Sequence, residues 1–320
     1  MRLLITGGFG YIGGRLAEHL QKAGHQIILG SRSSRDSPAW LPEAEVGHTD
    51  WSDNCALERI CTGVDVVIQA AGMNAQDCAA DPLAALEANG LATARLIAAA
   101  SRSQVKRFIY LSTAHVYASP LEGTITEETC PRNLHPYSTS HLAGENAVLG
   151  ACLRREIESV VLRLSNSFGA PTHMDANCWM LLVNDLCRQA VESGKVVLSS
   201  SGMQQRDFVP LARICRVVER LSSRDFTPLL PSIVNVGSGV SKSVLEMAEL
   251  VRRRCSLTLG FHPEFRREEP SADERHGTLV FRSASLESLD ERMGDDTLAE
   301  IDGLLRFCLA SSNRNSSDSA

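Results

Sequence analysis

The stretch Thr6-Gly7-Gly8-Phe9-Gly10-Tyr11-Ile12-Gly13 follows the short apolar run Leu3-Leu4-Ile5 and precedes a helical pattern. This order predicts a strand, a glycine turn and the start of a helix. Glycine lets the backbone approach a pyrophosphate closely, and the N–H groups and positive dipole at a helix N-terminus stabilise its negative charge. A tight turn needs glycine whatever it binds, so the flanking strand and helix are what predict a dinucleotide site here.

Two glycine spacings fit the turn. Gly7, Gly10 and Gly13 form GxxGxxG, whereas Gly8 with the last two forms GxGxxG. The sequence leaves both open. The candidate cofactor-binding residues of the turn are Gly7, Phe9, Gly10, Tyr11, Ile12 and Gly13.

The composition is that of a globular protein. The chain has 320 residues, of which 43% are hydrophobic and 22% charged, so it is able to bury a sizeable core. Its formal net charge is −6 and it has no long basic block, so we expect no nucleic-acid partner. The run after Met1-Arg2 is too short for a signal-peptide core and no apolar run reaches membrane-spanning length, so we expect a cytoplasmic protein with no membrane partner.

The ten cysteines are scattered along the chain without a CxxC pair. This spacing indicates neither a zinc knuckle nor a redox dithiol, and we predict no metal site. We expect reduced, mostly buried thiols.

Short apolar runs alternate with helical patterns through the first half of the chain. The predicted strands are Leu3–Thr6, Gln26–Gly30, Val64–Ala70, Phe108–Ser112 and Ser159–Leu164, and the predicted helices lie near 11–23, 54–61, 82–102 and 137–156. Such alternation predicts an α/β fold, a Rossmann-type doubly wound parallel sheet with helices on both faces. Ligands of such sheets lie beyond the carboxyl ends of the strands, so the glycine turn, Ala71-Gly72 and Ser112–Tyr117 should converge.

The pattern changes after about residue 170. It predicts helices near 175–193, 211–222 and 242–254 and strands near 196–199, 206–209 and 233–237. We interpret this part as a smaller substrate-binding lobe, interleaved with the last sheet elements. The predicted domains are a cofactor-binding Rossmann domain over 1–170, the lobe over 171–310, and a flexible tail over 311–320, which is rich in Ser, Asn and Asp.

An ordered series of motifs follows the glycine turn. Ser112-Thr113 ends a predicted strand, and Tyr137-Ser138-Thr139-Ser140-His141 follows about 25 residues later. Further motifs of the series are Asp65–Ile68 before Ala70-Ala71-Gly72, Arg163–Pro171, Arg206–Val209 and Asn235–Gly239. With this series, the chain resembles the extended short-chain dehydrogenase/reductases, the NAD-dependent epimerase/dehydratase group that mostly acts on nucleotide sugars. The resemblance runs from residue 1 to about 310.

The resemblance implies the chemistry of the site. Tyr137 would exchange a proton with the substrate oxygen while the nicotinamide exchanges hydride with the attached carbon, and Ser112 or Thr113 would hydrogen-bond the same oxygen. Asp50 is similar to the family's adenine-contacting aspartate, with a helix N-cap role as the alternative. The remaining implied cofactor contacts are Trp51, Ala70, Ala71, Gly72, Asn89, Tyr137 and His141.

His141 departs from the family pattern, which has lysine four residues after the tyrosine. There the ammonium lowers the tyrosine pKa and binds the nicotinamide ribose. Histidine is largely uncharged at neutral pH, although it is still able to hydrogen-bond ribose hydroxyls. Three interpretations stay open: a working enzyme in which Tyr137 is chiefly a proton donor in ketone reduction, a slow or conditionally active enzyme, and a cofactor-binding protein without turnover.

The segment after the second strand bears on the choice of cofactor. It reads Gly30-Ser31-Arg32-Ser33-Ser34-Arg35, without the carboxylate that NAD enzymes usually offer to the adenosine ribose. Hydroxyls and a guanidinium suit the additional phosphate of NADP, so we favour NADP over NAD, with Ser31 and Arg32 as contacts. An ordinary polar loop is the alternative.

The candidate substrate contacts are fewer than the candidate cofactor contacts. His115 either contacts substrate or pairs with a backbone carbonyl. The 4,6-dehydratases of the family have an Asp-Glu pair where this chain has Ala114-His115, so we do not expect dehydration. The resemblance implies further contacts from Asn166, Asn177 and Arg206. The arginine that completes a diphosphate clamp stays open among Arg266, Arg267 and Arg275, with a solvated charge run as the alternative.

These observations predict an NAD(P)-dependent oxidoreductase acting on a nucleotide-activated sugar in activated-sugar or polysaccharide biosynthesis. It would be a 4-keto-sugar reductase, or an epimerase that passes through a keto intermediate. The alternative is a catalytically weak or inactive NAD(P)-binding sensor of the same fold. Relatives often dimerise through helices matching 82–102 and 137–156, so we expect a homodimer.

Overall fold

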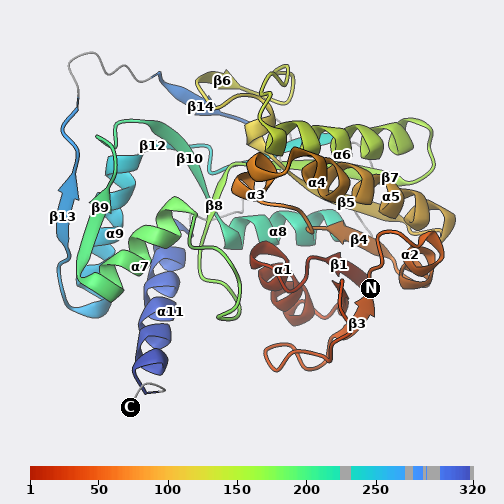
Figure 1. Ribbon diagram of the computed structural model, residues 1–320, viewed down its shortest axis with the longest axis horizontal. Coiled ribbons are helices and arrows are strands. Elements are labelled where there is room, and N and C mark those ends of the chain that lie inside the picture. Colours follow the sequence, from red (N-terminus) through yellow and green to blue (C-terminus); the bar gives the residue numbers. More distant parts are fainter. Residues whose placement is uncertain (224–231, 271–276, 284–285, 287–295, 318–320) are drawn as a thin grey trace. The chain divides into compact units, whose positions relative to one another are not determined.

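The structure is a computed structural model that describes residues 1–223, 232–270, 277–283, 286 and 296–317 (Figure 1). The chain divides into two compact units. The first consists of Met1–Pro120, Glu127–Leu164 and Cys215–Val236, and the second of Leu121–Thr126, Ser165–Ile214 and Gly237–Ala320. Each unit therefore takes in segments from several parts of the sequence.

A parallel sheet forms the centre of the first unit. Within the described residues it has seven strands in the order β11-β7-β5-β4-β1-β2-β3, and all neighbouring strands are parallel. The strands are β1 (Arg2–Thr6), β2 (Gln26–Ser31), β3 (Glu45–His48), β4 (Val66–Gln69), β5 (Arg107–Thr113), β7 (Glu158–Leu164) and β11 (Ile233–Val236). The strand order reverses between β1 and β4, where such sheets bind ligands. The predicted Rossmann-type sheet is confirmed.

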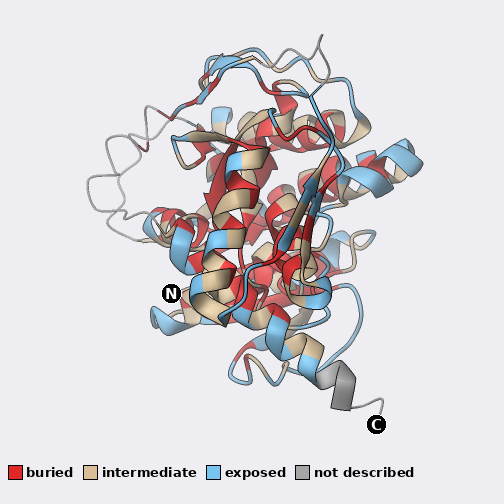
Figure 2. Ribbon diagram, turned by 90° about the vertical axis from the view of Figure 1, so that its left-hand side faces the viewer, coloured by how far each residue is buried: buried red, intermediate tan, exposed pale blue. Residues whose placement is uncertain are grey.

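Helices cover this sheet. They are α1 (Tyr11–Lys22), α2 (Asn54–Cys61), α3 (Ala75–Ala80), α4 (Pro82–Ala85), α5 (Ala92–Arg102), α6 (Pro136–Leu153) and the part of α8 (Leu211–Ser222) from Cys215 onward. Several helices in Figure 2 have buried residues along one side and exposed residues along the other. The helix predicted over 82–102 is interrupted by a π-helical turn, η1 (Leu86–Leu91), and a 3-10 turn, η2 (Ala114–Val116), follows β5.

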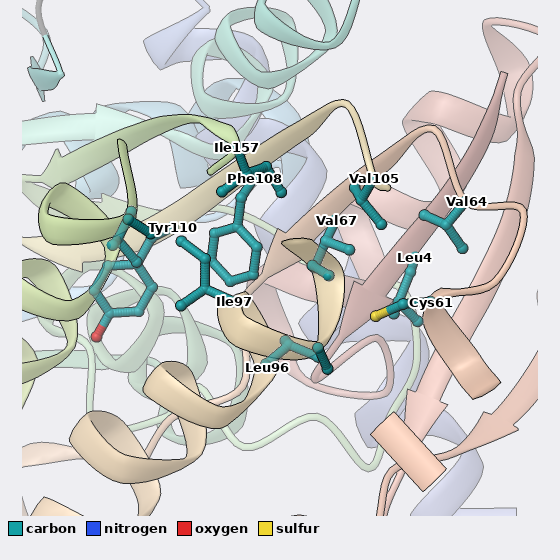
Figure 3. Packing of buried hydrophobic residues seen from close by; sticks show 14 of the residues in the cluster. Leu4, Cys61, Val64, Val67, Leu96, Ile97, Val105, Phe108, Tyr110 and Ile157 are labelled. Atoms are coloured by element: carbon teal, nitrogen blue, oxygen red, sulfur yellow. The ribbon is translucent and has the colours of Figure 1, made fainter. Parts of the chain in front are cut away.

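An apolar core lies between the sheet and α2, α5 and α6. Leu4, Val67 and Phe108 project from neighbouring strands and are fully buried with Leu96 of α5 (Figure 3). Burying side chains of this size stabilises the fold by roughly 1.5–3 kcal/mol each. The core thereby holds the carboxyl ends of β1, β4 and β5 in a constant arrangement.

The described part of the second unit combines small sheets with helices. Its sheet has the order β12-β10-β8, made by β12 (Ser241–Ser243), β10 (Gln205–Pro210) and β8 (Asn166–Phe168). Two parallel pairs join β13 (Glu264–Arg267) to β9 (Lys195–Leu198) and β14 (Leu279–Phe281) to β6 (Gly123–Ile125). The helices α7 (Leu182–Ser193), α9 (Val244–Leu259) and α11 (Thr297–Ser317) share an apolar core that contains Val251 and Leu304.

The structure of this unit differs from the predicted pattern in two places. α7 begins at Leu182 and not near 175, because short turns such as the bond from the Leu181 N–H to the Cys178 carbonyl occupy the preceding residues. α11 continues to Ser317 and so occupies most of the expected flexible tail, whereas 318–320 lie outside the described residues. The domain boundaries at 170 and 310 remain predictions.

None of the helices in the described residues combines the length and apolar character needed to cross a bilayer. All ten cysteines lie in the described part of the chain, and none of them forms a disulfide bond there.

Candidate active site

The glycine turn joins β1 to α1 through a backbone that excludes side chains. Gly7 has a φ of +66°, and a Cβ there would lie 2.7 Å from the Ala71 backbone nitrogen. A Cβ at Gly13 would overlap the Gly7 carbonyl oxygen, and the Gly10 N–H donates to that oxygen at 2.8 Å. Gly10 is the N-cap of α1, and as a glycine it has no side chain to cap the helix. The turn is thus a side-chain-free cradle at a helix N-terminus, which fits a pyrophosphate.

The geometry distinguishes between the two glycine spacings. Gly7 needs a left-handed backbone, whereas the nearest atom to a Cβ at Gly8 would be the end of the Leu29 side chain, at 2.6 Å. The GxxGxxG spacing of Gly7, Gly10 and Gly13 is therefore the one that shapes the turn.

Two cations lie near the end of β2. Ser31 is buried and its hydroxyl donates to the Ser33 carbonyl at 2.8 Å, while Arg32 is exposed. The Arg35 guanidinium lies 4.6 Å from the ring centroid of Phe9, in the glycine turn, and Phe9 packs edge-on against Trp40. Arg35 belongs to the polar segment after β2 but is not one of the predicted cofactor contacts. A cation–π contact holds it over the turn, which no sequence pattern indicated.

Asp50 and Trp51 follow β3. Asp50 accepts hydrogen bonds from the Ser52 hydroxyl at 2.6 Å and the Ser52 N–H at 2.9 Å, which lower the pKa of its carboxyl. The N-cap of α2 is Asp53, so the alternative N-cap role for Asp50 is wrong. Trp51 packs against the core and its carbonyl accepts from Arg95 at 2.8 Å.

The backbone after β4 lies beside the glycine turn. The Ala70 N–H donates to the Thr6 carbonyl at 3.3 Å. A side chain at Gly7 would collide with backbone atoms of Ala70 and Ala71. At Gly72 a Cβ would lie 3.1 Å from the Asn89 carboxamide oxygen. The expected convergence of the ends of β1 and β4 is therefore found in the structure.

Asn89 connects this loop to α6. It lies in the π-helical turn η1 and is 1% exposed. Its Oδ1 accepts from the Met73 N–H at 2.7 Å, and its Nδ2 donates to the Ser140 hydroxyl at 3.0 Å. Single π-turns inside helices often mark functional sites, because the extra residue redirects one side chain. Asn89 therefore positions the loop rather than pointing freely into it.

Ser112 and Thr113 have different surroundings. The Ser112 hydroxyl donates to Glu145 at 2.5 Å, and Glu145 also forms a buried ion pair with Arg163 at 2.6 Å. Thr113 hydrogen-bonds Tyr137. Successive residues of a strand face opposite sides, so only one of the two reaches the tyrosine. Of the two alternatives, the structure places Thr113 beside Tyr137.

Tyr137 and His141 lie one helical turn apart at the start of α6. Their ring centroids are 4.6 Å apart with an edge-on geometry of 71°. Burial raises the pKa of Tyr137, although the hydrogen bond with Thr113 opposes the shift. Burial also lowers the pKa of His141 to about 4. At neutral pH both groups are therefore uncharged, and the tyrosine carries its proton.

Hydrogen bonds to its backbone carbonyl fix the position of His115. Its carbonyl accepts from the Asn133 side chain at 2.8 Å and from the Ser138 hydroxyl at 2.9 Å, and these bonds join the loop after β5 to the start of α6. The side chain is partly buried. Its contact with substrate stays a prediction.

The other expected substrate residues belong to the second unit. Asn166 donates to the Asp207 carbonyl at 2.9 Å, and Arg206 donates to the Gln204 side chain at 2.8 Å, with burial lowering the Arg206 pKa. Asn177 is exposed. The first two already have partners within their own unit, and their substrate roles stay predictions.

The candidate clamp arginines also have partners. Arg266 donates to Glu264 at 2.7 Å on an exposed surface, as in a solvated charge run, whereas Arg267 donates to the Ser201 carbonyl at 2.8 Å. Arg275 lies outside the described residues.

Known proteins share this architecture. A dTDP-6-deoxy-L-talose 4-dehydrogenase (NAD(P)(+)) from Kitasatospora kifunensis is 30% identical over 259 residues, which cover 78% of this chain and 78% of that protein. A UDP-glucose 4-epimerase from Streptomyces lividans is 27% identical over 271 residues, covering 79% and 80%. The crystal structure of a UDP-glucuronic acid 4-epimerase from Bacillus cereus in complex with NAD matches with a TM-score of 0.77 at 20% identity, covering 98% of this chain and 100% of that one.

The family comparison agrees with the motifs. The profile of the family described as NAD dependent epimerase/dehydratase matches residues 3–237, which include the glycine turn, Thr113, Tyr137 and His141. The seven-stranded sheet of the described residues has the strand order that this nucleotide-binding fold requires. The chain belongs to the NAD-dependent epimerase/dehydratase family and is an extended short-chain dehydrogenase/reductase.

Proposed function

We propose that this protein reduces the 4-keto group of a nucleotide-activated sugar, with epimerisation through a keto intermediate as the nearest alternative reaction. The observation that carries the proposal is the edge-on contact of Tyr137 with His141, 4.6 Å between ring centroids, in surroundings whose burial raises the pKa of the tyrosine and lowers that of the histidine. NAD(P)H, when bound at the glycine turn, would supply hydride to the carbonyl carbon. Tyr137 would donate its proton to the carbonyl oxygen, and Thr113 would hydrogen-bond the same oxygen.

The protonation states of Tyr137 and His141 favour reduction over epimerisation. An epimerase must first oxidise its substrate, which requires a tyrosinate to remove a hydroxyl proton. Burial raises the pKa of Tyr137, and His141, whose pKa burial lowers to about 4, supplies no cation at neutral pH to stabilise a tyrosinate. Reduction needs only the phenol, so it uses the protonation state that this site favours.

The named relatives support the substrate class. One is a 4-dehydrogenase of a dTDP-deoxysugar that uses NAD(P)+, and its reverse reaction is a 4-keto reduction. Another is a UDP-glucose 4-epimerase. Dehydration is not part of the proposal, because Ala114 and His115 supply no carboxylate at the positions where the family's 4,6-dehydratases have Asp and Glu.

A stoichiometric assay tests the proposal. Purified protein is mixed with deuterium-labelled NADPH or NADH and a panel of dTDP- and UDP-4-keto-sugars. A reductase consumes one cofactor per sugar and leaves deuterium on the product carbon. An epimerase interconverts UDP-sugars without net consumption. Turnover of UDP-sugars with no reduction of any keto-sugar would contradict the reductase proposal.

One observation favours a binding protein without turnover as the second candidate. The uncharged His141 removes the cation through which the family's lysine promotes proton transfer. Tight NAD(P)H binding with no oxidation across the keto-sugar panel would establish this candidate over the enzyme.

For the cofactor we propose NADP rather than NAD. Arg35 is held over Phe9 of the glycine turn, and Arg32 is exposed next to Ser31 at the end of β2. Guanidinium groups there suit a 2′-phosphate, whose charge they would pair. A lower Kd for NADPH than for NADH, measured on the apoprotein, is the expected result.

We also propose a homodimer formed through α4, α5 and α6. α5 and α6 run side by side (Figure 1), and Leu83, Leu86 and Leu91 are 69%, 45% and 46% exposed on the same helical segment. Apolar side chains grouped in this way are typical of protein interfaces. Light scattering should report twice the mass of one chain, and a monomer at micromolar concentration would contradict the proposal.

A further inference from the structure

Tyr110 is a buried tyrosine whose hydroxyl faces the active-site helix. It lies on β5, two residues before Ser112, and is 1% exposed. Figure 3 shows it at one end of the apolar cluster, with its hydroxyl pointing away from Phe108 and Ile97. The hydroxyl oxygen is 3.0 Å from Nδ1 of His141 and 3.5 Å from the Asn89 carbonyl oxygen.

The phenol has one proton to give. Burial raises the Tyr110 pKa far above its usual range, so the hydroxyl stays protonated. The hydroxyl also hydrogen-bonds the Thr93 side chain, whose own O–H is able to donate to the phenol oxygen. The phenol proton itself has Nδ1 of His141 and the Asn89 carbonyl as its other acceptors. The contact with Nδ1 is shorter by half an ångström, 3.0 against 3.5 Å, and 3.5 Å is long for a hydrogen bond from a hydroxyl. If Nδ1 accepts, the neutral imidazole carries its own proton on Nε2.

The Nε2 edge of His141 faces the backbone after β4. A Cβ at Gly72 would lie 3.8 Å from Nε2 and 3.7 Å from Cε1, so the absence of a side chain at Gly72 keeps this edge open. In the part of the chain that the structure describes, the ring's hydrogen bond is the one from Tyr110, and Nε2 has no protein partner. The polar edge therefore faces the end of the sheet where a dinucleotide binds.

We propose that Tyr110 is a positioning residue that holds His141 as the Nε2–H tautomer, so that a neutral histidine presents a hydrogen-bond donor to the nicotinamide ribose. A lysine at this position donates through a charged ammonium. Here the donor is kept, because Tyr110 donates to Nδ1 and leaves the ring proton on Nε2, whereas the charge is lost, because a neutral imidazole carries a single proton. The inference rests on the cofactor position of the proposed function, but not on turnover.

The tautomer is measurable without catalysis. Nitrogen-15 spectra of histidine-labelled apoprotein distinguish a protonated from an unprotonated ring nitrogen. Wild type should show His141 with the proton on Nε2, and Tyr110→Phe should show a mixture or the Nδ1–H form. A wild-type spectrum with the proton on Nδ1 would overturn the proposal, whether or not the variant folds.

Tyr117→Phe is the matched control. Tyr117 is also 1% exposed and its hydroxyl donates to Asn235 at 2.8 Å, so the variant loses one buried hydroxyl of the same kind. It should leave the His141 tautomer unchanged. If both variants altered the tautomer alike, a general loosening of the core would explain the effect and the proposal would fail.

Cofactor affinity gives a second readout. The Kd for NADPH should rise roughly three- to tenfold in Tyr110→Phe, the value of one hydrogen bond, and stay unchanged in Tyr117→Phe. In a His141→Lys background, Tyr110→Phe should no longer matter, since lysine has no tautomer to select. An equal rise in both backgrounds would overturn the proposal. Absence of sugar turnover in wild type would count against the proposed function and leave these measurements intact.

Discussion

The glycine turn and the Tyr137–His141 pair lie in the same unit, but the first is a backbone site and the second a side-chain site. The turn is backbone, and at Gly7 and Gly13 an added Cβ would collide with other backbone atoms. The pair consists of side chains whose pKa values depend on burial and, for Tyr137, on a hydrogen bond with the Thr113 hydroxyl. Where backbone atoms leave no room for a side chain, few residues other than glycine fit. Where a site depends on a hydrogen bond, a different residue fits if it provides the same donor. This difference explains how the chain retains the family's turn and departs at His141.

The largest effect should come from breaking the backbone site. Gly13→Ala would push a methyl group into the Gly7 carbonyl oxygen, so the turn must deform. We expect loss of NADPH binding by at least about 100-fold and a lower free energy of unfolding. Gly303→Ala is the control, because a Cβ there meets nothing within 4 Å and alanine favours a helix. Calorimetric titration and urea unfolding of both variants provide the check.

Removing the phenol tests the side-chain site directly. Tyr137→Phe should lower kcat for keto-sugar reduction by roughly 10²–10⁴-fold, the usual contribution of a positioned acid, and leave the Kd for NADPH nearly unchanged. Tyr117→Phe serves again as the control. A Tyr137→Phe enzyme with nearly full kcat would place the proton donor elsewhere.

Buried His141 should make the protein sensitive to acid. Its folded-state pKa of about 4 lies below the value near 6.5 expected for an unfolded chain. The unfolded state therefore binds the proton more readily, and the free energy of unfolding falls as pH drops from about 6.5 to 4, by up to about 3 kcal/mol. His141→Gln should flatten that pH dependence. Equal slopes in urea unfolding of the two proteins would show that His141 is not the group responsible.

Restoring a cation should move the pH profile of activity. His141→Lys would stabilise the tyrosinate, so the pKa of Tyr137 would fall and reduction would lose its proton donor at lower pH. The alkaline limb of kcat should shift downward by about 1–2 pH units, and UDP-sugar oxidation should improve. His141→Gln, which adds no charge, should leave the limb in place. A limb that does not move with lysine would mean that residue 141 does not influence the ionisation of Tyr137.

The smallest effect concerns cofactor choice. Arg35→Ala should raise the Kd for NADPH about tenfold and leave that for NADH unchanged, because only the former has a phosphate to pair. Arg154→Ala, which removes an exposed arginine paired with Glu156, is the control. An equal loss for both cofactors would assign Arg35 to packing on Phe9 rather than to phosphate recognition.

Much of the first unit was predictable because its signals are local. Apolar runs predicted β1, β2, β4, β5 and β7, and the i, i+4 spacing put Tyr137 and His141 on one helical face. β3 was missed because its residues, Glu45–His48, are largely exposed and form no apolar run. α11 was missed because its amphipathic pattern is weak and the polar composition of its end is typical of a tail.

The sequence by itself determined the glycine turn, the parallel sheet and the tyrosine with a histidine one turn later, since each depends on residues close together in the chain. Only the tertiary structure decided that Thr113 and not Ser112 meets Tyr137, and that Tyr110 on β5 reaches His141 across 31 positions of sequence. Along the chain Tyr110 is one more residue of a buried strand. Its proposed role depends on which way its hydroxyl points, and the packing of α6 against the sheet determines that direction.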